Sequence, residues 1–549
     1  MSEAQGAYDG AVLFMLIVAG VLTCILGVVA LVLLRRAIVR FMAASSRQSA
    51  AALPERPRQA ATAPLNATID SGPADAGLSD HILLRVAAAH LAAGLAFATS
   101  AAVILLTMSG LELFPLRTAI VTWSLAWPTV IVLSLLVGPD RRMQGLIVLG
   151  YIGGLLAFGI PLWAIGTPAL EFAGLVIPGF FQPVIIWLLH ASPSLFLLLF
   201  LNRTIRTIGP LVLLFVFVLL LGTQIAISIL AVPSVLMATA RAGVAIGLDA
   251  YQLFAGVIVI GALALSWPAW RTVALLRDRY AAKRSSELML TIGAIWLLQA
   301  IVLASALFPT WGLVGVAAAL APFAAWRIAL HITLRPALAA ARKRPPSRLL
   351  LLRVFGFGRR SRRLLDLLGT RWRLIGSIDL IAAPDLASRT IEPATFLEFV
   401  RGRLASLFIR APAQLDQRMA ALDRQPDPDA RFRINQLFCT DAMWREAVTR
   451  LMAEASLVVM DLRGFTPDRR GCIYEIETLL DTVPLARLVF LFDRTTHFRA
   501  LETVLGEHWQ RLDVNSPNLA LREPVLRLID ANDDEPKVVR RLLAIAQAP

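Results

Sequence analysis

The chain has 549 residues, of which 57% are hydrophobic and only 17% are charged, and its mean hydropathy is +0.68. Ordinary globular proteins carry about 25% charged residues, so this composition excludes a wholly soluble fold. The formal net charge of +15 does not indicate nucleic-acid binding, because the basic residues cluster where apolar runs end, as they do in inserted membrane proteins. With three cysteines, the chain cannot build a disulfide framework or a four-cysteine zinc site.

The first part of the chain is predicted to be a bundle of transmembrane helices. A helix that crosses the hydrocarbon core needs about 20 predominantly apolar residues. We expect nine such spans, with eight to ten compatible with the pattern, and an interfacial or re-entrant piece before the fifth. The runs are 10–34, 82–108, 118–138, 145–166, 184–201, 208–231, 252–270, 288–308 and 312–334.

Charge and composition then divide the chain into four regions. Residues 1–40 read as a transmembrane anchor, and residues 41–80, rich in Ala, Pro and Ser, read as a flexible cytoplasmic linker. Residues 81–335 form the multi-span bundle, and residues 345–549 form a separate α/β domain. The chain is therefore expected to have the lipid bilayer as a partner.

Arginine placement predicts the topology of this bundle. Arginine clusters follow the first span and recur in alternate loops, while the acidic N-terminus and the loops between those clusters carry few basic residues. Positive loops stay on the cytoplasmic side. We therefore expect the N-terminus outside, nine spans, and the C-terminal domain in the cytoplasm, beneath the plasma (inner) membrane.

Polar residues inside the predicted spans are few. Gln224 and Gln299 suit hydrogen bonds between helices, and Arg327, about one turn from His331, suits a side chain that reaches the inner interface. Proton and ion pathways usually need several converging ionisable groups. A transporter or channel with a regulatory domain is kept as a third hypothesis for the chain.

After Arg348 the pattern changes to short apolar runs separated by charged, amphipathic helices. Strands are predicted at 349–355, 373–383, 432–439, 456–462, 486–493 and 525–530, with helices between them, including 359–368, 393–409, 441–455 and 472–482. Such alternation is typical of a parallel sheet covered on both faces, a three-layer α/β domain. We predict the flavodoxin-like strand order 2-1-3-4-5.

Ligands of such sheets bind outside the carboxyl ends of the strands. Arg353 lies near the end of the first predicted strand, Asp461 ends the fourth, and the loop 463–471 follows it, with Arg463, Gly464 and Gly471. Arg353 needs an acceptor, which Asp461, Glu475 or a ligand phosphate could supply. Asp461 could instead bond the loop amides of Gly464 and beyond. We expect Arg353 and Glu475 on one side of a pocket there.

The order of motifs in residues 349–495 resembles bacterial membrane proteins with a C-terminal TIR-like domain. The resemblance rests on Leu350–Phe355, on the run from Trp444 into Ala455–Val459, and on the helix that begins Gly471-Cys472-Ile-Tyr-Glu475. In enzymatic TIR domains a Cys-x-x-Glu helix supplies the catalytic glutamate of NAD⁺ hydrolysis. The resemblance therefore implies Glu475 as a catalytic residue, although Gly471 replaces the usual Trp before the Cys.

The residues themselves allow two interpretations of Glu475. A fixed carboxylate can stabilise positive charge on a ribose as its glycosidic bond breaks. A carboxylate in the first turn of a helix is also favoured by the helix dipole alone. The leading functional hypothesis is a multi-pass sensor or signalling protein whose TIR-like domain binds a nucleotide such as NAD⁺. Hydrolysis of that nucleotide is the enzymatic version of this hypothesis. A non-enzymatic assembly module is the second hypothesis. A homo-oligomer is compatible with both hypotheses. Neither hypothesis needs a resident cofactor or metal.

Overall fold

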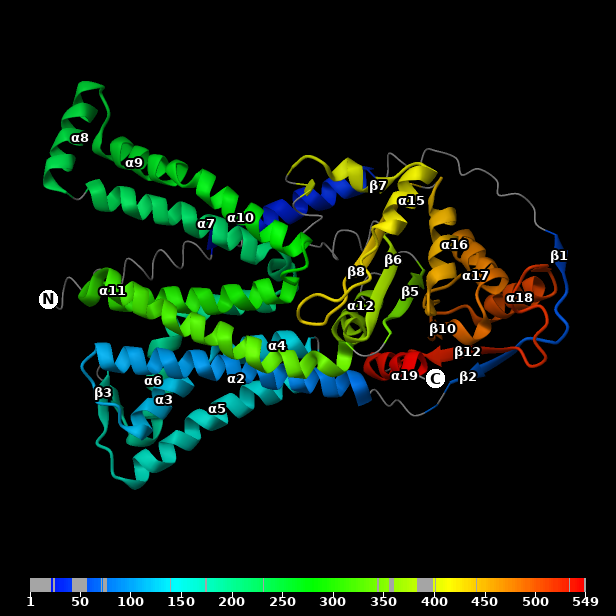
Figure 1. The fold of residues 1–549 in the computed structure, drawn as a ribbon, viewed down its shortest axis with the longest axis horizontal. Helices are drawn as coiled ribbons and strands as arrows, with labels where there is room; N and C mark the ends of the chain where they lie inside the picture. Colours follow the sequence, from blue (N-terminus) through cyan, green and yellow to red (C-terminus); the bar gives the residue numbers. More distant parts are fainter. Residues whose placement is uncertain are drawn as a thin grey trace.

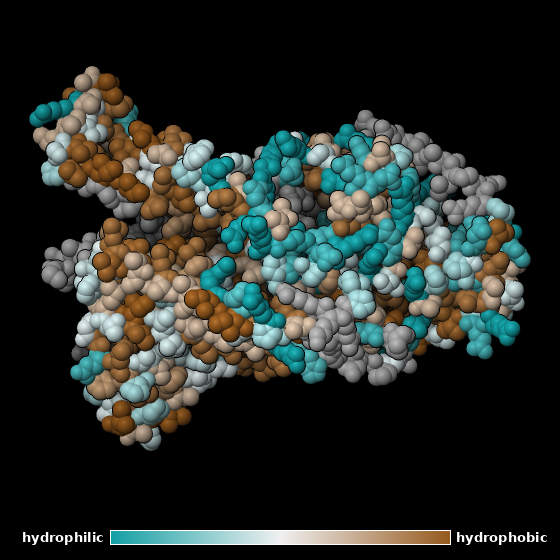
Figure 2. All heavy atoms as spheres, viewed as in Figure 1, coloured by the Kyte–Doolittle hydropathy of each residue, from teal (hydrophilic) through white to brown (hydrophobic). Residues whose placement is uncertain are grey.

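The computed structural model describes residues 21–22, 25–41, 57–70, 72, 77–138, 140–172, 175–230, 232–342, 345–354, 360–382, 398–399, 401–440, 442–532 and 534–547. Long helices form one part of the molecule and an α/β domain forms the other, and the two parts are in contact (Figure 1). Apolar residues dominate the surface of the helical part, and hydrophilic residues gather over the α/β domain (Figure 2). The division into two differently solvated parts is therefore confirmed.

The helical part consists of a series of helices joined by short loops. They are α2 (Gly77–Met108), α3 (Pro115–Leu125), α4 (Pro128–Val137), α5 (Arg141–Ala164), α6 (Gln182–Ala191), α7 (Arg203–Leu230), α8 (Pro233–Ala245), α9 (Ala250–Ala264), α10 (Ser266–Ala281) and α11 (Glu287–Arg342), with the hairpin β3 (Leu170–Phe172) and β4 (Leu175–Ile177) and the 3₁₀ turns η1 (Gly179–Phe181) and η2 (Ser192–Leu201). Within the described residues, seven helices are long and apolar enough to cross a membrane, or eight if the pair α3 and α4, bent by 47°, forms one span. This fits a multi-pass membrane protein.

Eight of the nine predicted spans coincide with these candidates. The remaining one, 10–34, lies largely outside the described residues, although residues 25–41 are helical. α11 holds two of the predicted spans, because the chain reverses at Gly312, whose φ of 55° interrupts the helix. A positive φ is open to glycine at little cost, so a residue of this type suits a tight reversal between two spans.

The predicted loops lie at two opposite ends of the bundle. The indole nitrogen of Trp311 donates a hydrogen bond of 3.0 Å to the carbonyl of Met108, which joins the loop after α2 to the turn inside α11. The β3 strand and α8 lie at this same end, remote from the α/β domain (Figure 1). At the other end, the loop after α10 contacts the α/β domain through Lys283 and Asp423. The alternation of loops expected from the arginines is consistent with this arrangement.

The α/β domain is built on an eight-stranded sheet with the order β2-β12-β10-β9-β5-β6-β8-β7, and all of its neighbouring strands are parallel. The strands are β2 (Asn66–Ile69), β5 (Ser347–Arg353), β6 (Gly376–Ile381), β7 (Phe408–Ile409), β8 (Ile434–Cys439), β9 (Leu457–Asp461), β10 (Leu488–Phe492) and β12 (Val525–Asp530). The parallel α/β class is confirmed.

The predicted flavodoxin-like order is wrong. Counted in chain order, strands β5, β6, β8, β9, β10 and β12 lie in the order 3-2-1-4-5-6, which is the order of doubly wound sheets that bind dinucleotides. The third strand, β8, lies beyond β6 instead of between β5 and β9. Its burial explains this position: β9 is buried at every residue, whereas β8 carries the half-buried Ile434 and Gln436 and suits a more peripheral site.

Helices cover both faces of the sheet. On one face, α12 (Arg360–Arg371) and α19 (Glu535–Gln547) pack on the odd-numbered residues of β5 and β9, such as Leu351 and Val459. On the other face, even-numbered residues such as Leu352 and Met460 meet four helices and the turn η5 (Leu485–Arg487). These helices are α15 (Pro412–Ala420), α16 (Trp444–Glu454), α17 (Arg470–Thr482) and α18 (Phe498–Trp509).

The edge of the sheet nearest the bundle ends differently from our prediction. The helix predicted at 393–409 is wrong for residues 401–409, which form a turn, the 3₁₀ turn η4 (Leu404–Leu407) and strand β7, whereas residues 393–397 and 400 lie outside the described residues. Phe408 of β7 packs against Phe438 of β8, with ring centroids 5.5 Å apart. Leu34 and Ile38 of the N-terminal helix join the same buried cluster. In place of the end of the predicted helix, residues 408–409 therefore form a strand that pairs with β8 and contacts the membrane helices.

The predicted flexible linker 41–80 contains part of the α/β domain. Its strand β1 (Arg58–Gln59) pairs antiparallel with β11 (Leu512–Asp513), and β2 forms the edge of the main sheet beside β12. The indole nitrogen of Trp509 donates a hydrogen bond of 2.8 Å to the carbonyl of Ala63. The domain predicted as 345–549 is therefore completed by residues 57–70, which reach its far edge (Figure 1).

Candidate functional site

The topological switch point of the sheet lies between β5 and β9. From β5 the chain continues to β6 and β8 on one side of β5, and it then returns to β9 on the other side. Arg353 ends β5 and Asp461 ends β9, and the two residues are register partners in the parallel ladder. The helix after β5 is α12 and the helix after β9 is α17, and these pack on opposite faces of the sheet. A crevice opens outside the carboxyl ends of strands where neighbouring connections diverge in this way, and ligands of doubly wound sheets bind there. Arg353 and Asp461 thus lie together at this switch point, as predicted from the sequence.

A buried chain of alternating charges begins at Asp461. The Arg463 guanidinium donates to both carboxylate oxygens of Asp461, from Nε at 2.7 Å and Nη2 at 2.8 Å. Its Nη1 atom lies 3.2 Å from Glu535 at the start of α19, and Glu535 is paired with Arg363 of α12 at 3.0 Å. Only 1% of the Arg463 side chain is exposed. A two-pronged, buried pair of this kind holds its partners in one geometry.

The fold of the loop after β9 follows from this pairing. Asp461 also accepts a hydrogen bond from the backbone N–H of Arg463 at 3.3 Å, so Asp461 holds the backbone at the start of this loop. Gly464 has a φ of 75°, a conformation that glycine adopts without a Cβ penalty. Phe465 is fully buried and anchors the turn through a hydrogen bond from its N–H to the carbonyl of Leu462.

Glu475 lies on the other wall of the switch point. It is 3% exposed and points to the sheet with Cys472 and Ile476, which share its helix face. Burial raises the pKa of Glu475 to about 8, and the Arg353 guanidinium opposes that rise. Among the described residues, none donates a hydrogen bond to its Oε2 atom. A buried carboxyl oxygen without a donor is unusual and calls for an explanation such as a water or ligand.

Two details of the predicted pocket need correction. Arg353 and Glu475 do not lie on one side of the site: alternation along β5 puts Arg353 on the face of α12, whereas Glu475 belongs to α17 on the opposite face. Glu475 is also in the second turn of α17, which begins at Arg470, so the helix-dipole account for a first-turn acid does not apply. Gly471 is exposed and has no neighbour near its Cβ position, so it lies apart from the buried cluster.

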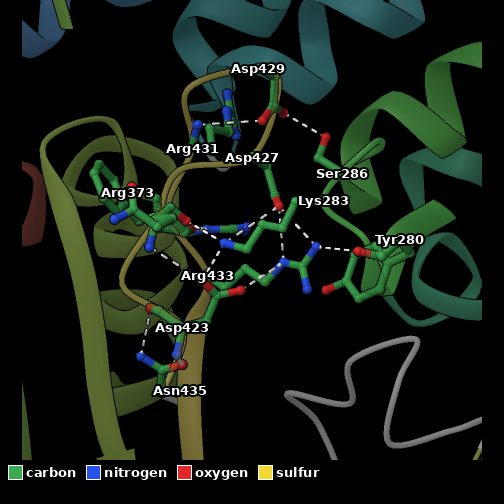
Figure 3. A network of polar contacts seen from close by, with 12 residues as sticks. Tyr280, Lys283, Ser286, Arg373, Asp423, Asp427, Asp429, Arg431, Arg433 and Asn435 are labelled. Atoms are coloured by element: carbon green, nitrogen blue, oxygen red, sulfur yellow. Dashed lines mark hydrogen bonds and ion pairs between the residues drawn. The ribbon is translucent and has the colours of Figure 1, made fainter. Parts of the chain in front are cut away.

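A second polar cluster lies where the α/β domain meets the bundle (Figure 3). Arg433 donates from Nε to both oxygens of Asp427 at 3.1 Å and from Nη2 to the carbonyl of Tyr280 at 2.6 Å. Its guanidinium carbon lies 3.8 Å from the centroid of the Tyr280 ring. Lys283, in the loop between α10 and α11, pairs with Asp423. We call this set, together with Ser286, Asp429 and Arg431, the docking network.

The docking network is buried or half-buried and contacts several membrane-side elements. Ser286 donates a hydrogen bond of 2.7 Å to Asp429, and Arg431 donates to the carbonyl of Leu136 at 3.5 Å. Asp427 and Asp429 are 2% and 3% exposed. Burial raises the pKa of Asp427, and the hydrogen bond from Arg433 opposes that rise. Buried ionic groups of this kind fix the relative position of the parts they join, because removing one partner leaves a charge without compensation.

Further contacts extend this junction along α12. Arg371 forms an ion pair with Asp80 at the start of α2. A side chain at Gly138 would clash with Thr370, so glycine permits the close approach of α4 to α12. The α/β domain is therefore held against α2, α4, α10 and α11 by contacts from α12 and from the segment before β8.

Sequence reasoning missed two features of these sites. The segment 423–433 reads as a surface turn, since Asp-Pro-Asp is typical of turns, and nothing in its composition predicts burial against another part. The sequence after β5 also reads Gly356-Phe-Gly358-Arg-Arg-Ser361. A Gly-x-Gly after the first strand is the signal for a phosphate-binding turn in doubly wound sheets, although Ser361 replaces the third glycine. Residues 355–359 lie outside the described residues.

Comparison of the sequence with protein-family models and with curated proteins found no match.

Proposed function

We propose that this chain is a membrane sensor, whose cytoplasmic α/β domain binds a nucleotide such as NAD⁺ at the β5–β9 switch point. The proposal rests on the positions of Arg353 and Asp461, which are register neighbours at the carboxyl ends of β5 and β9. The helices that follow these two strands pack on opposite faces of the sheet. In doubly wound sheets this is the place where dinucleotides bind. The Gly356-Phe-Gly358 sequence after β5 supports a phosphate at the same edge.

Binding is better supported than hydrolysis. A pKa of about 8 keeps Glu475 mainly protonated at neutral pH, and a neutral acid does not stabilise positive charge on a ribose. A ligand with a cationic ring, such as the nicotinamide of NAD⁺, would favour the ionised form if it lay beside Glu475. We therefore expect NAD⁺ binding to release a proton, and hydrolysis to depend on that ionisation.

Helix α12 supplies a path from the switch point to the helices of the bundle. The α12 helix begins after β5 at the switch point and ends at Thr370 and Arg371, which contact α4 and α2. A ligand can shift an equilibrium only by its different affinity for two states. We infer that nucleotide binding repositions α12 and thereby changes the packing of the membrane helices.

The test is ligand-dependent stability of the full chain in detergent. A ligand present at 100 times its Kd stabilises a protein by about 2.7 kcal/mol, so NAD⁺ or ADP-ribose should raise the Tm of the α/β domain. Glu475→Gln should abolish proton release on NAD⁺ binding and any hydrolysis. Glu477→Gln, on the exposed side of the same helix, is the matched control. If NAD⁺, ADP-ribose and ATP all leave the Tm unchanged, the nucleotide hypothesis fails and an assembly module becomes the better interpretation.

A further inference from the structure

A cavity of about 280 Å³ lies where the two halves of α11 meet the α/β domain. The second half of α11 supplies most of its wall, with Leu330, Leu334 and Leu338 as a buried apolar floor. Met289 of the first half and Pro428 of the α/β domain close the remaining sides. The volume is just below the range of about 300–1,000 Å³ that is typical of pockets for drug-sized ligands, so the cavity suits a smaller group.

The polar lining of this cavity is basic. Arg327, His331 and Arg335 follow one another at intervals of four residues, which puts them on one face of the helix. All three are exposed, and no described residue forms a hydrogen bond or ion pair with any of them. None of the residues that line the cavity is acidic. The cavity therefore presents two permanent positive charges and an imidazole to an anion.

The neighbouring residues place this basic face at the boundary of the bilayer. Ile328 and Ile332, which follow Arg327 and His331 in the chain, are 61% and 64% exposed, which suits contact with lipid chains. Residues Thr310–Pro336 form one of the candidate spans, and Arg335 lies at its last turn. Basic pockets between transmembrane helices on the cytoplasmic side are where anionic lipid headgroups bind.

We propose that this cavity binds the phosphate-bearing headgroup of an anionic membrane lipid, such as a phosphatidylglycerol. The two guanidiniums hold the phosphate, the imidazole donates a further hydrogen bond, and the acyl chains run along Ile328 and Ile332. This proposal does not depend on the nucleotide site, because it rests on a different part of the molecule.

The position of Pro428 gives the lipid a structural consequence. Pro428 lies between Asp427 and Asp429, which both belong to the docking network. A headgroup that fills the cavity contacts this segment from the membrane side and restrains it. Anionic lipid should therefore stabilise the docked arrangement of the α/β domain, whereas a neutral lipid should not.

The experiment uses the full chain in nanodiscs that contain either phosphatidylglycerol or phosphatidylcholine, together with native mass spectrometry of the detergent-solubilised protein. The wild type should retain phosphatidylglycerol and should show slower hydrogen exchange in residues 421–435 in phosphatidylglycerol nanodiscs. Each basic residue near an anionic membrane contributes roughly five-fold in affinity. The double variant Arg327→Gln with Arg335→Gln should therefore bind the lipid roughly 25-fold more weakly.

The matched control is Arg117→Gln with Arg241→Gln, which removes the same charge at the far end of the bundle and should retain the lipid. Inorganic phosphate and AMP, added to phosphatidylcholine nanodiscs, separate a lipid headgroup from a free phosphate. If either gives the same protection of 421–435 as phosphatidylglycerol, the ligand is a soluble phosphate and the lipid assignment is wrong. The proposal is also overturned if the wild type shows no preference for phosphatidylglycerol, or if both double variants lose the lipid equally.

Discussion

The guanidinium carbon of Arg433 lies over the ring of Tyr280, 3.8 Å from its centroid, while the same guanidinium pairs with the carboxylate of Asp427. One side chain of the α/β domain thus contacts both Tyr280 of helix α10 and the buried carboxylate of Asp427. This double contact makes Arg433 the most informative position for testing how the two parts are joined.

Arg433→Gln should loosen the docking of the α/β domain. Removing one partner of a buried ion pair costs about 3–5 kcal/mol, and the buried Asp427 would keep only its longer contact with Lys283, at 3.9 Å. Hydrogen exchange in residues 421–435 of the full chain should then accelerate by a factor of roughly 150 to 5,000. Arg433→Lys should give an intermediate result, since lysine keeps the charge but loses the planar fork.

Arg450→Gln is the control for this substitution. Arg450 pairs with Asp416 and Glu446 at the surface, with 36% of its side chain exposed, and exposed pairs contribute at most about 1 kcal/mol. Equal exchange in the Arg433 and Arg450 variants would show that the docking network does not hold the two parts together.

The stability of the α/β domain should fall as the pH rises because of Glu475. Its pKa is raised from 4.5 to about 8 in the folded chain, so between these values the folded state binds more protons than the unfolded state. Stability then decreases by up to about 1.4 kcal/mol per pH unit across this window and is constant above it. Thermal melting of the full chain from pH 5 to pH 8.5 measures this slope.

Glu475→Gln should remove the same slope. The variant should match the wild type near pH 5 and exceed its Tm above pH 8, because glutamine fits the site without a charge to bury. Glu477→Gln, with a side chain that is 37% exposed as glutamate, should keep the wild-type profile. Parallel pH profiles for the wild type and Glu475→Gln would mean that Glu475 is ionised in the folded protein at neutral pH.

A fragment of residues 345–549 should be poorly soluble alone. It lacks β2, so β12 becomes an edge strand with unpaired backbone groups, and such edges promote aggregation. Adding residues 57–70 through a flexible linker should restore the edge and the hydrogen bond between Trp509 and Ala63. Sedimentation measures the fraction of each fragment that is monomeric. A fragment of 345–549 that is monomeric and stable would show that β2 is dispensable.

The two ends of the bundle should be accessible from opposite sides of the membrane. Tyr251, in the first turn of α9, is 88% exposed, and Tyr251→Cys should react in intact cells with a maleimide that does not cross membranes. Arg494→Cys, on the α/β domain, should react only after the cells are opened. Reaction of Arg494→Cys in intact cells would reverse the orientation expected from the arginine clusters.

The existence and type of most elements could be predicted from the sequence, because long apolar runs and short buried strands are strong signals. The carboxyl-edge position of Arg353 and Asp461 followed from the same pattern. Strand order could not be predicted, since the alternation of strands and helices does not specify on which side of β5 the next strand lies. The polar residues Asn435 and Gln436 within β8 were the available hint in the sequence.

The remaining errors have a common cause. Strand β2 has only one large apolar residue, Ile69, which is 59% exposed, and it lies in a Pro-rich segment that reads as linker. Asp427 and Asp429 read as turn residues because their burial depends on a partner surface hundreds of residues away in the chain. Pairing and burial created by distant segments leave little trace in local composition.

The far-edge position of β2 has a consequence for biosynthesis. Thr62 donates a hydrogen bond to the carbonyl of Leu519, 457 residues later in the chain, so this side of the domain closes only after every span of the bundle has been made. At about 5–20 residues per second, the N-terminal strand waits roughly 25–90 s for its partner. Its polar composition and flanking prolines suit such a wait, since a short strand with little apolar surface resists pairing with other nascent chains.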